Sequence, residues 1–494
     1  DFEQMGARGK VDANYKKFTF GTNLSFNYSV YNIVPTEDRY KEETIVASAL
    51  AMSPTMPVYN ADGSYNFDQW NWQYKHPQIV NPVALANEKE DQMKRYRFRG
   101  NVYGEYELYK NLKFKTSFGV DFNSYSRSYY RPSTLPTSLD RLPPSVPEGS
   151  KRDKNMLNWV WENTLSYTTV IKDVHNLSAI AGWTAQKESV NTSLLAGNGY
   201  PNDLVHTMNA ASAITSWSAT AYEWSLLSAL ARVQYSYKGK YLLSAAARMD
   251  GSSRFGKNNR WGMFPSASAG WYISEEDFMK DQKFFDYLKL RASWGRLGND
   301  HVAASDGFAS ITTGNSASGV FGNSTFPGYQ NTTYFSYLKW ELVDETNVGL
   351  NFSTFKNRLN VDLDYFYRLT KRAVISPRLP FSNDVLAGNY GKILNSGFDL
   401  SLNWNDNIGR DFKYNLGVNL SYLKNKVKDL GGLSSIKGGK TINMVGKEMN
   451  SYYGYKVVGV YQTLEECAED PIAVANKLVP GDFKYEDVNG DNVI

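Results

Sequence analysis

The sequence predicts an all-β protein, a large antiparallel transmembrane β-barrel. Apolar and polar residues alternate strictly over long stretches, and short polar turns alternate with long irregular loops. Aromatic residues make up 15% of the chain, with 35 Tyr among them. Tyrosine is amphipathic, so this excess suits a protein with much surface at a boundary between water and an apolar phase.

The alternation defines individual strands, each with one apolar and one polar face. It is clearest in five segments, at residues 23–30, 112–123, 359–368, 398–404 and 414–422. In the third segment only Phe366 departs from the pattern. Segments of this kind predict about fourteen strands.

The connections between strands fall into two classes. Short turns are expected at Lys16-Lys17, Lys110-Asn111, Lys172-Asp173, Lys238-Gly239-Lys240 and Lys356-Asn357-Arg358. Long loops are expected at about 31–92, 129–153, 188–220, 298–338, 373–390 and 426–450. Short turns on one rim and long loops on the other are typical of outer-membrane barrels. Because no linker divides the chain, we expect one barrel domain over residues 1–494.

A soluble β-sandwich or barrel is the alternative, and the mean hydropathy of −0.49 is compatible with it. No run of about eighteen apolar residues is present, so the sequence predicts no transmembrane helix. The strands, however, approach the 9–11 residues that cross a bilayer. Their polar faces carry Ser, Asn, Gly and Asp, and aromatic residues such as Tyr106, Tyr109 and Trp161 crowd the strand ends. These features favour a membrane barrel.

Composition argues against several other classes. The 54 basic and 50 acidic residues nearly balance, so nothing indicates nucleic-acid binding. The single cysteine, Cys467, excludes an internal disulfide and a cysteine-based zinc site. The 4 His are scattered, and we find no catalytic motif, so we expect no enzyme. We interpret Asp362 and Asp364 as solvated residues of a polar strand face.

Several stretches carry a family resemblance. One runs through Arg248-Met249-Asp250-Gly251-Ser252-Ser253-Arg254-Phe255-Gly256 and Trp261-Gly262-Met263-Phe264-Pro265. Others are Asn81-Pro82-Val83-Ala84, Asn395-Ser396-Gly397-Phe398-Asp399-Leu400, Tyr453-Gly454-Tyr455-Lys456 and Pro480-Gly481-Asp482-Phe483-Lys484-Tyr485. In this order they resemble the SusC/RagA family of TonB-dependent outer-membrane transporters.

The resemblance implies the rest of the architecture. Such transporters form a barrel of about 22 strands, blocked by an N-terminal plug. We expect the plug and the segment that contacts TonB to lie upstream of residue 1. The chain also ends in a loop-like segment, so we expect a partial barrel with further strands after residue 494.

The same resemblance implies a function. It is active import of an oligosaccharide or a peptide across the bacterial outer membrane, where the chain would be a multi-pass barrel in contact with lipid. The implied partners are a SusD-like surface lipoprotein and the TonB–ExbB–ExbD complex. A passive porin or an adhesin-type barrel remains an alternative.

Two groups of residues are candidates for binding. Trp70, Trp72 and Tyr74 lie in a long loop, where their rings could stack on sugar. Packing within the loop would explain them equally well.

A second candidate is a loop resembling the first half of a calcium site. Asp487, Asn489 and Asp491 have the spacing of the side-chain ligands, and Val493 would offer its carbonyl oxygen. Asn492 replaces the usual turn glycine, although Asn tolerates positive φ. The alternative is a solvated turn that binds no metal.

Overall fold

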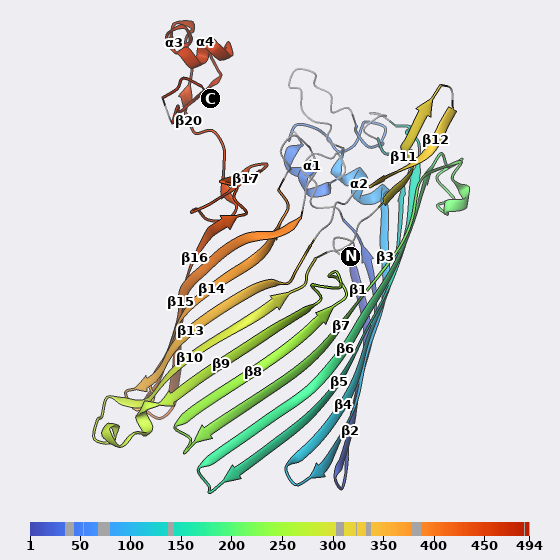
Figure 1. The fold of residues 1–494 in the computed structure, drawn as a ribbon. Helices are drawn as coiled ribbons and strands as arrows, with labels where there is room; N and C mark the ends of the chain where they lie inside the picture. The colour runs from blue at the N-terminus through green and yellow to red at the C-terminus, as the bar shows by residue number, and fades with distance from the viewer. Residues whose placement is uncertain are drawn as a thin grey trace. The chain divides into compact units, whose positions relative to one another are not determined.

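The computed structural model describes residues 1–34, 44–52, 54–67, 80–136, 143–302, 311–322, 324–331, 337–377, 387–488 and 490–493. Among these residues, a 14-stranded sheet has the order β1-β2-β3-β4-β5-β6-β7-β8-β9-β10-β13-β14-β15-β16 (Figure 1). Consecutive long strands are therefore neighbours, as in an antiparallel meander. The predicted strand number and fold class are confirmed.

The chain forms two compact units. The first comprises Asp1–Lys238, Ser244–Met263 and Val302–Ser305, and the second Gly239–Leu243, Phe264–His301 and Asp306–Ile494. The first holds β1 (Phe2–Tyr15), β2 (Phe18–Asn32), β3 (Glu90–Tyr109), β4 (Leu112–Arg131), β5 (Glu148–Ile171), β6 (His175–Asn198) and β7 (Ala213–Tyr237). The second holds β10 (Phe285–Asn299), β13 (Glu341–Thr354), β14 (Leu359–Ile375), β15 (Gly388–Ile408) and β16 (Phe412–Leu430). Strands β8 (Tyr241–Ser252) and β9 (Trp261–Tyr272) contribute residues to both. The prediction of one barrel domain stays a prediction.

In the first unit the register aligns the apolar residues of neighbouring strands. Phe26 of β2 pairs with Phe98 of β3, which pairs with Phe122 of β4, which pairs with Leu157 of β5. These side chains stay 38–47% exposed, so they form a continuous apolar surface and no packed core. Such a surface suits contact with lipid.

The apolar surface ends part of the way along the strands. We call the face that carries this apolar surface the outward face. On β5 its residues change from Leu157 to Asn155, Asp153 and Lys151, although the strand continues to Glu148. Strands β5, β6 and β7 have 24, 24 and 25 residues, so the predicted loops 129–153 and 188–220 were too long. These strand ends could not be predicted from the sequence, because both faces are polar there and apolar residues no longer alternate with polar ones.

The predicted short turns are confirmed. Each lies between two strands, and it begins with or contains a residue of positive φ: Lys16 (53°), Asn111 (69°), Lys172 (51°), Lys238 (50°) and Lys356 (60°). Two-residue connections with positive φ match the twist of antiparallel strands. We call the end of a strand at these turns its turn side, and the opposite end its loop side.

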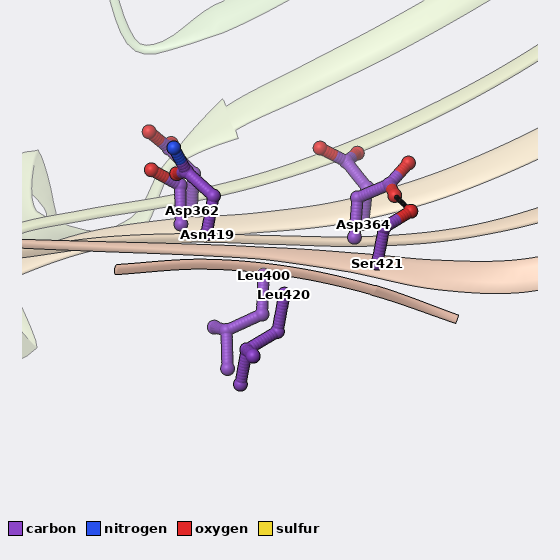
Figure 2. A pocket seen from close by; sticks show the side chains of 8 residues that line it. Asp362, Asp364, Leu400, Asn419, Leu420 and Ser421 are labelled. Atoms are coloured by element: carbon purple, nitrogen blue, oxygen red, sulfur yellow. Dashed lines mark hydrogen bonds between the residues drawn. The ribbon is translucent and has the colours of Figure 1, made fainter. Parts of the chain in front are cut away.

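In the second unit a row of leucines crosses five strands. It contains Leu290, Leu350, Leu363, Leu400 and Leu420. The adjacent row on the other face contains Arg291, Gly349, Asp364, Asp399 and Ser421. Figure 2 shows this separation, with Leu400 and Leu420 on the side of the sheet opposite Asp362, Asp364, Asn419 and Ser421.

Phe366, the exception in the predicted alternation, lies on the polar face. It pairs across the strands with Gly397. A Cβ at Gly397 would approach the Phe366 ring to 3.0 Å and would overlap the backbone carbonyl oxygen of Tyr422. The glycine of the Asn-Ser-Gly motif therefore makes room for the aromatic ring.

Smaller elements lie in the connections. In the first unit, α2 (Pro82–Glu88) contributes Ala84 and Leu85 to a small core with Val80 and Leu135, and Ile45 of α1 (Ile45–Ala51) packs against it. The motif residue Asn81 caps α2 by accepting hydrogen bonds from the backbone N–H groups of Val83 and Ala84. In the described part of the chain, every helix is too short or too polar to cross a membrane.

Several short strands and helices belong to the second unit. They are the hairpin β11 (Ile311–Phe321) and β12 (Ser324–Asn331), strands β17 (Ser435–Gly438), β18 (Thr441–Met444) and β19 (Ser451–Tyr452), and strands β20 (Val457–Val460) and β21 (Phe483–Tyr485) with helices α3 (Leu464–Glu469) and α4 (Pro471–Asn476). Single-turn 3-10 helices are found at Met208–Ala210 in the first unit and at Ile273–Glu275 and Asp277–Met279 in the second.

Candidate functional site

The polar face of the second unit contains a pocket of about 210 Å³ (Figure 2). Strands β14, β15 and β16 supply its lining, which is Asp362, Asp364, Asp399, Leu400, Ser401, Asn419, Leu420 and Ser421. Apart from the two leucines, whose side chains lie on the opposite side of the sheet (Figure 2), the lining carries carboxylate, amide and hydroxyl groups. Such groups form hydrogen bonds with hydroxyl-rich or amide-rich ligands.

Charge in this pocket is only partly compensated. Asp364 lies directly opposite Asp399 across β14 and β15, an unfavourable like-charge pairing. Arg291 offsets it, with its guanidinium 2.5 Å from Asp364 and its Nε 2.8 Å from the amide oxygen of Asn351. Asp399 accepts a hydrogen bond from the Ser421 hydroxyl. The polar face around the pocket is therefore acidic.

The polar face of the first unit is basic instead. Arg95, Arg97 and Arg99 follow one another along β3. Arg97 donates two hydrogen bonds to Asp121 of β4, at 3.0 and 2.6 Å, and Arg99 donates one at 3.3 Å. Bidentate contacts of this kind hold the guanidinium plane in a fixed orientation. Arg95 bonds the Asn123 amide oxygen at 2.7 Å.

A polar cluster joins two loops of the first unit. The Asp203 carboxylate accepts hydrogen bonds from the Tyr130 hydroxyl at 2.8 Å, the Ser133 hydroxyl at 2.5 Å and the Ser133 N–H at 3.0 Å. Burial works against ionisation of Asp203, but these donors outweigh it and lower its pKa. Burial and the nearby Asp203 carboxylate raise the pKa of Tyr130. The loop after β4 is thereby attached to the loop after β6.

Residues 453–488 contain the motifs Tyr453-Gly454-Tyr455-Lys456 and Pro480-Gly481-Asp482-Phe483-Lys484-Tyr485, and they form a small folded segment of the second unit. Tyr461 is fully buried beside Cys467 and Ala473, and its hydroxyl bonds Asp470 at 2.7 Å. Burial, followed by this bond to Asp470, raises the pKa of Tyr461 to about 12. Strands β20 and β21 pair at its edge. The second of these motifs thus belongs to a packed structural element, because Phe483, Lys484 and Tyr485 pair with β20.

The predicted site residues have different outcomes. Trp70, Trp72 and Tyr74 lie outside the described residues and stay predictions, as does Asn489. Asp487 accepts hydrogen bonds from the N–H groups of Gly490 and Asn492, both at 2.8 Å. Asn492 has φ of 57°, so it adopts the conformation for which such loops use glycine.

Among the described residues, no group of three or more His, Cys, Asp or Glu side chains is close enough to hold a metal ion. A site at Asp487, Asp491 and Val493 would need Asn489 and further oxygen ligands. The calcium site stays a prediction.

Sequence reasoning missed Asp399 as part of an acidic pocket and missed Arg291 as the partner of Asp364 beside it. Arg291 is 73 residues from Asp364, and only the register of β10, β13, β14 and β15 brings them together. It also missed Asp203, because polar residues in a long loop carry no periodic signal.

Long two-faced strands, short turns and polar side chains on one face define an outer-membrane β-barrel. The chain matches the family described as "TonB dependent receptor-like, beta-barrel" over residues 4–462, and it belongs to this family. Its similarity to TonB-dependent receptor P3 of Formosa agariphila is 29% identity over 513 residues, covering 100% of this chain and 50% of that protein.

Two further relatives support a SusC/RagA-like chain. TonB-dependent receptor SusC of Bacteroides thetaiotaomicron is 27% identical over 502 residues, covering 90% of this chain and 48% of that protein. The structure of the RagAB peptide transporter has a TM-score of 0.82 at 21% identity, covering 93% of this chain and 51% of that one. At this identity the likeness shows the fold. The chain spans about half the length of the relatives it matches.

Proposed function

We propose that this chain is most of the wall of a TonB-dependent importer that takes up an oligosaccharide or an oligopeptide. The membership of residues 4–462 in the receptor barrel family carries this proposal. The apolar face suits contact with lipid, and the polar face offers charged and hydrogen-bonding groups to a solute. The outer membrane has no ATP supply and holds no ion gradient, so uphill uptake there requires energy from the inner membrane.

The proposed partners follow from the relatives. A SusD-like lipoprotein would cover the loop side, and the TonB–ExbB–ExbD complex would supply energy through a plug domain. The polar lining supports a substrate rich in hydroxyl or amide groups, because Ser hydroxyls and Asn amides both donate and accept hydrogen bonds, and Asp carboxylates accept them. We infer no enzymatic step, since the barrel family is a class of transporters.

Deleting TonB in the host tests the energy source. Growth on the cognate nutrient should stop, whereas growth on a small sugar that diffuses through general porins should continue. Unimpaired growth on the cognate nutrient would instead support the passive porin.

A second experiment tests the SusD-like lipoprotein as a partner that covers the barrel as a lid. The full-length protein, solubilised in mild detergent and captured through a tag, should retain a surface lipoprotein in constant ratio. Recovery of the barrel alone, at a detergent concentration that preserves other outer-membrane complexes, would contradict the proposed partner.

A further inference from the structure

The outward, apolar face of the second unit ends in a group of cations, which we call the outer basic cluster. On β14 the outward residues run Leu363, Tyr365, Tyr367, Leu369 and then Lys371 towards the loop side. On β16 they run Leu420, Tyr422, Lys424 and Lys426. The cluster consists of Arg296, Lys371, Lys392, Lys424 and Lys426.

The position of the cluster relative to the tyrosines fixes its depth. Phe398 and Tyr422 stack on the apolar face with ring centroids 5.6 Å apart, and Lys424 is the next outward residue of β16. Tyrosines on a lipid-facing surface mark the boundary between hydrocarbon and headgroups. The cations therefore begin where lipid headgroups lie.

Few carboxylates neutralise this cluster. Asp344 bonds both Arg296, at 2.6 Å, and Lys371, at 2.8 Å. Asp429 bonds Lys392 at 2.9 Å. Lys424 and Lys426 have no carboxylate partner in the described part of the chain. Five cations thus share two carboxylates on this face.

The outward face of the first unit does not repeat this pattern. Its charged residues on β1 to β7 are Lys94, Lys151, Lys187, Glu3, Glu90, Asp153 and Glu223. Lys187 and Glu223 form an ion pair at 2.8 Å. Acidic residues outnumber basic ones there, so a positive outer face is a property of β10 and β13 to β16.

We propose that the outer basic cluster binds the phosphate groups of the anionic glycolipid in the outer leaflet. The unpaired ammonium groups of Lys424 and Lys426 would contact phosphate, and the Tyr422 and Phe398 rings would lie against its acyl chains. Juxtamembrane cations attract anionic headgroups through short-range electrostatics, and this attraction weakens with salt. The inference depends on the loop side facing the cell exterior and does not depend on transport.

Native mass spectrometry of the full-length protein, titrated with phosphorylated lipid A, tests this proposal. The double variant K424Q/K426Q should bind the lipid about thirty-fold more weakly, because two headgroup cations are lost. The control K94Q/K151Q makes the same charge change on the outward face of the first unit and should bind as the unaltered protein does. The K424R/K426R variant should keep the affinity.

A second titration uses dephosphorylated lipid A. The unaltered protein should bind this lipid weakly, with the affinity that the K424Q/K426Q variant has for phosphorylated lipid A. Equal binding of both lipids by the unaltered protein would overturn the proposal. So would an equal loss in K94Q/K151Q, since that would indicate a general charge effect. Retention of the heat-modifiable gel mobility of a folded barrel establishes that each variant is folded.

Discussion

The His206 imidazole stacks on the Tyr130 ring, with centroids 3.9 Å apart and planes 13° from parallel. One imidazole nitrogen lies 3.0 Å from the Glu90 carboxylate, and the other lies 2.8 Å from the backbone carbonyl of Asp203. Both nitrogens therefore face acceptors, which only the protonated ring can satisfy completely. The first residues of β3 and the loop after β6 are joined through this one side chain.

This geometry makes the attachment of residues 199–212 dependent on pH. Burial lowers the pKa of His206, but the Asp203 carbonyl and the Glu90 carboxylate outweigh it, and the pKa lies above the ordinary value of 6.5. The stabilisation is therefore fully present below pH 6.5 and is lost as pH rises through the raised pKa. The lowered pKa of Asp203 acts in the opposite direction, since its contribution disappears in acid.

The protection of the amides of residues 199–212, which is the intrinsic exchange rate at a given pH divided by the measured rate, should consequently be greatest in mildly acidic solution and several-fold lower at pH 9. The His206→Gln variant, which cannot titrate in this range, should show no such change in protection. A pH dependence of equal size in both proteins would assign it to another group.

Gly397→Ala should destabilise the barrel by roughly 1–3 kcal/mol, because its Cβ would overlap the Tyr422 carbonyl and crowd Phe366. The matched control is Gly9→Ala in β1, where no atom lies within 4 Å of the added carbon. The temperature at which heat-modifiable gel mobility is lost measures the effect. Equal midpoints for the two variants would show that β15 and β16 can separate at no cost.

The orientation of the strands predicts which connections are accessible from outside. A peptide tag inserted within 205–215 should bind antibody on intact cells, and a tag at Lys238–Lys240 should bind only after the membrane is permeabilised. The reverse result would place the short turns outside and would remove the basis for the proposed lid and lipid contacts.

Replacing Trp70 and Trp72 with Ala should weaken substrate binding by roughly 1–3 kcal/mol if both rings stack on the ligand. Trp217→Ala is the control, since that side chain is 78% exposed and lies in β7, outside the loop that contains Trp70 and Trp72. Calorimetry on the full-length protein measures the affinity. If a folded variant binds the substrate with unchanged affinity, the two tryptophans serve only to pack the loop.

Calcium binding at Asp487, Asn489, Asp491 and Val493 can be followed by terbium luminescence of the full-length protein. The Asp487→Asn and Asp491→Asn changes together should abolish a calcium-displaceable signal. Asp62→Asn is the control, because Asp62 also bonds a loop backbone N–H, that of Ser64 at 3.0 Å. A signal that survives the double change would show that the ion binds elsewhere. The absence of a signal in the unaltered protein would show that this loop is a solvated turn that binds no calcium.

The sequence predicted the strands well where one face is apolar, because a period of two follows directly from the pleat. It predicted the turns at Lys16 and Asn111 for the same reason, since polar residues interrupt that period. It could not predict that Arg291 faces Asp364, or that Asp203 bonds Ser133. Both contacts join residues 70 or more positions apart, and only the strand register or loop path determines them.

The apparent irregularity at Phe366 shows the same limit on a smaller scale. An aromatic residue on the polar face contradicts the alternation when a strand is considered alone. Gly397 lies opposite Phe366 on the neighbouring strand, and its missing side chain leaves room for the aromatic ring. Period-based reasoning treats one strand at a time and has no access to such compensation.

The length of β5 and β6 has a mechanical consequence. A strand of 24 residues extends about 80 Å, and at a tilt near 45° it rises roughly 55 Å, whereas the apolar band of such barrels is about 25 Å tall. About 30 Å of hydrogen-bonded sheet would therefore lie outside the apolar band. A rigid stem of this height holds the loops at a set distance from the cell surface, so a large molecule meets them before its own bulk collides with neighbouring lipid sugars.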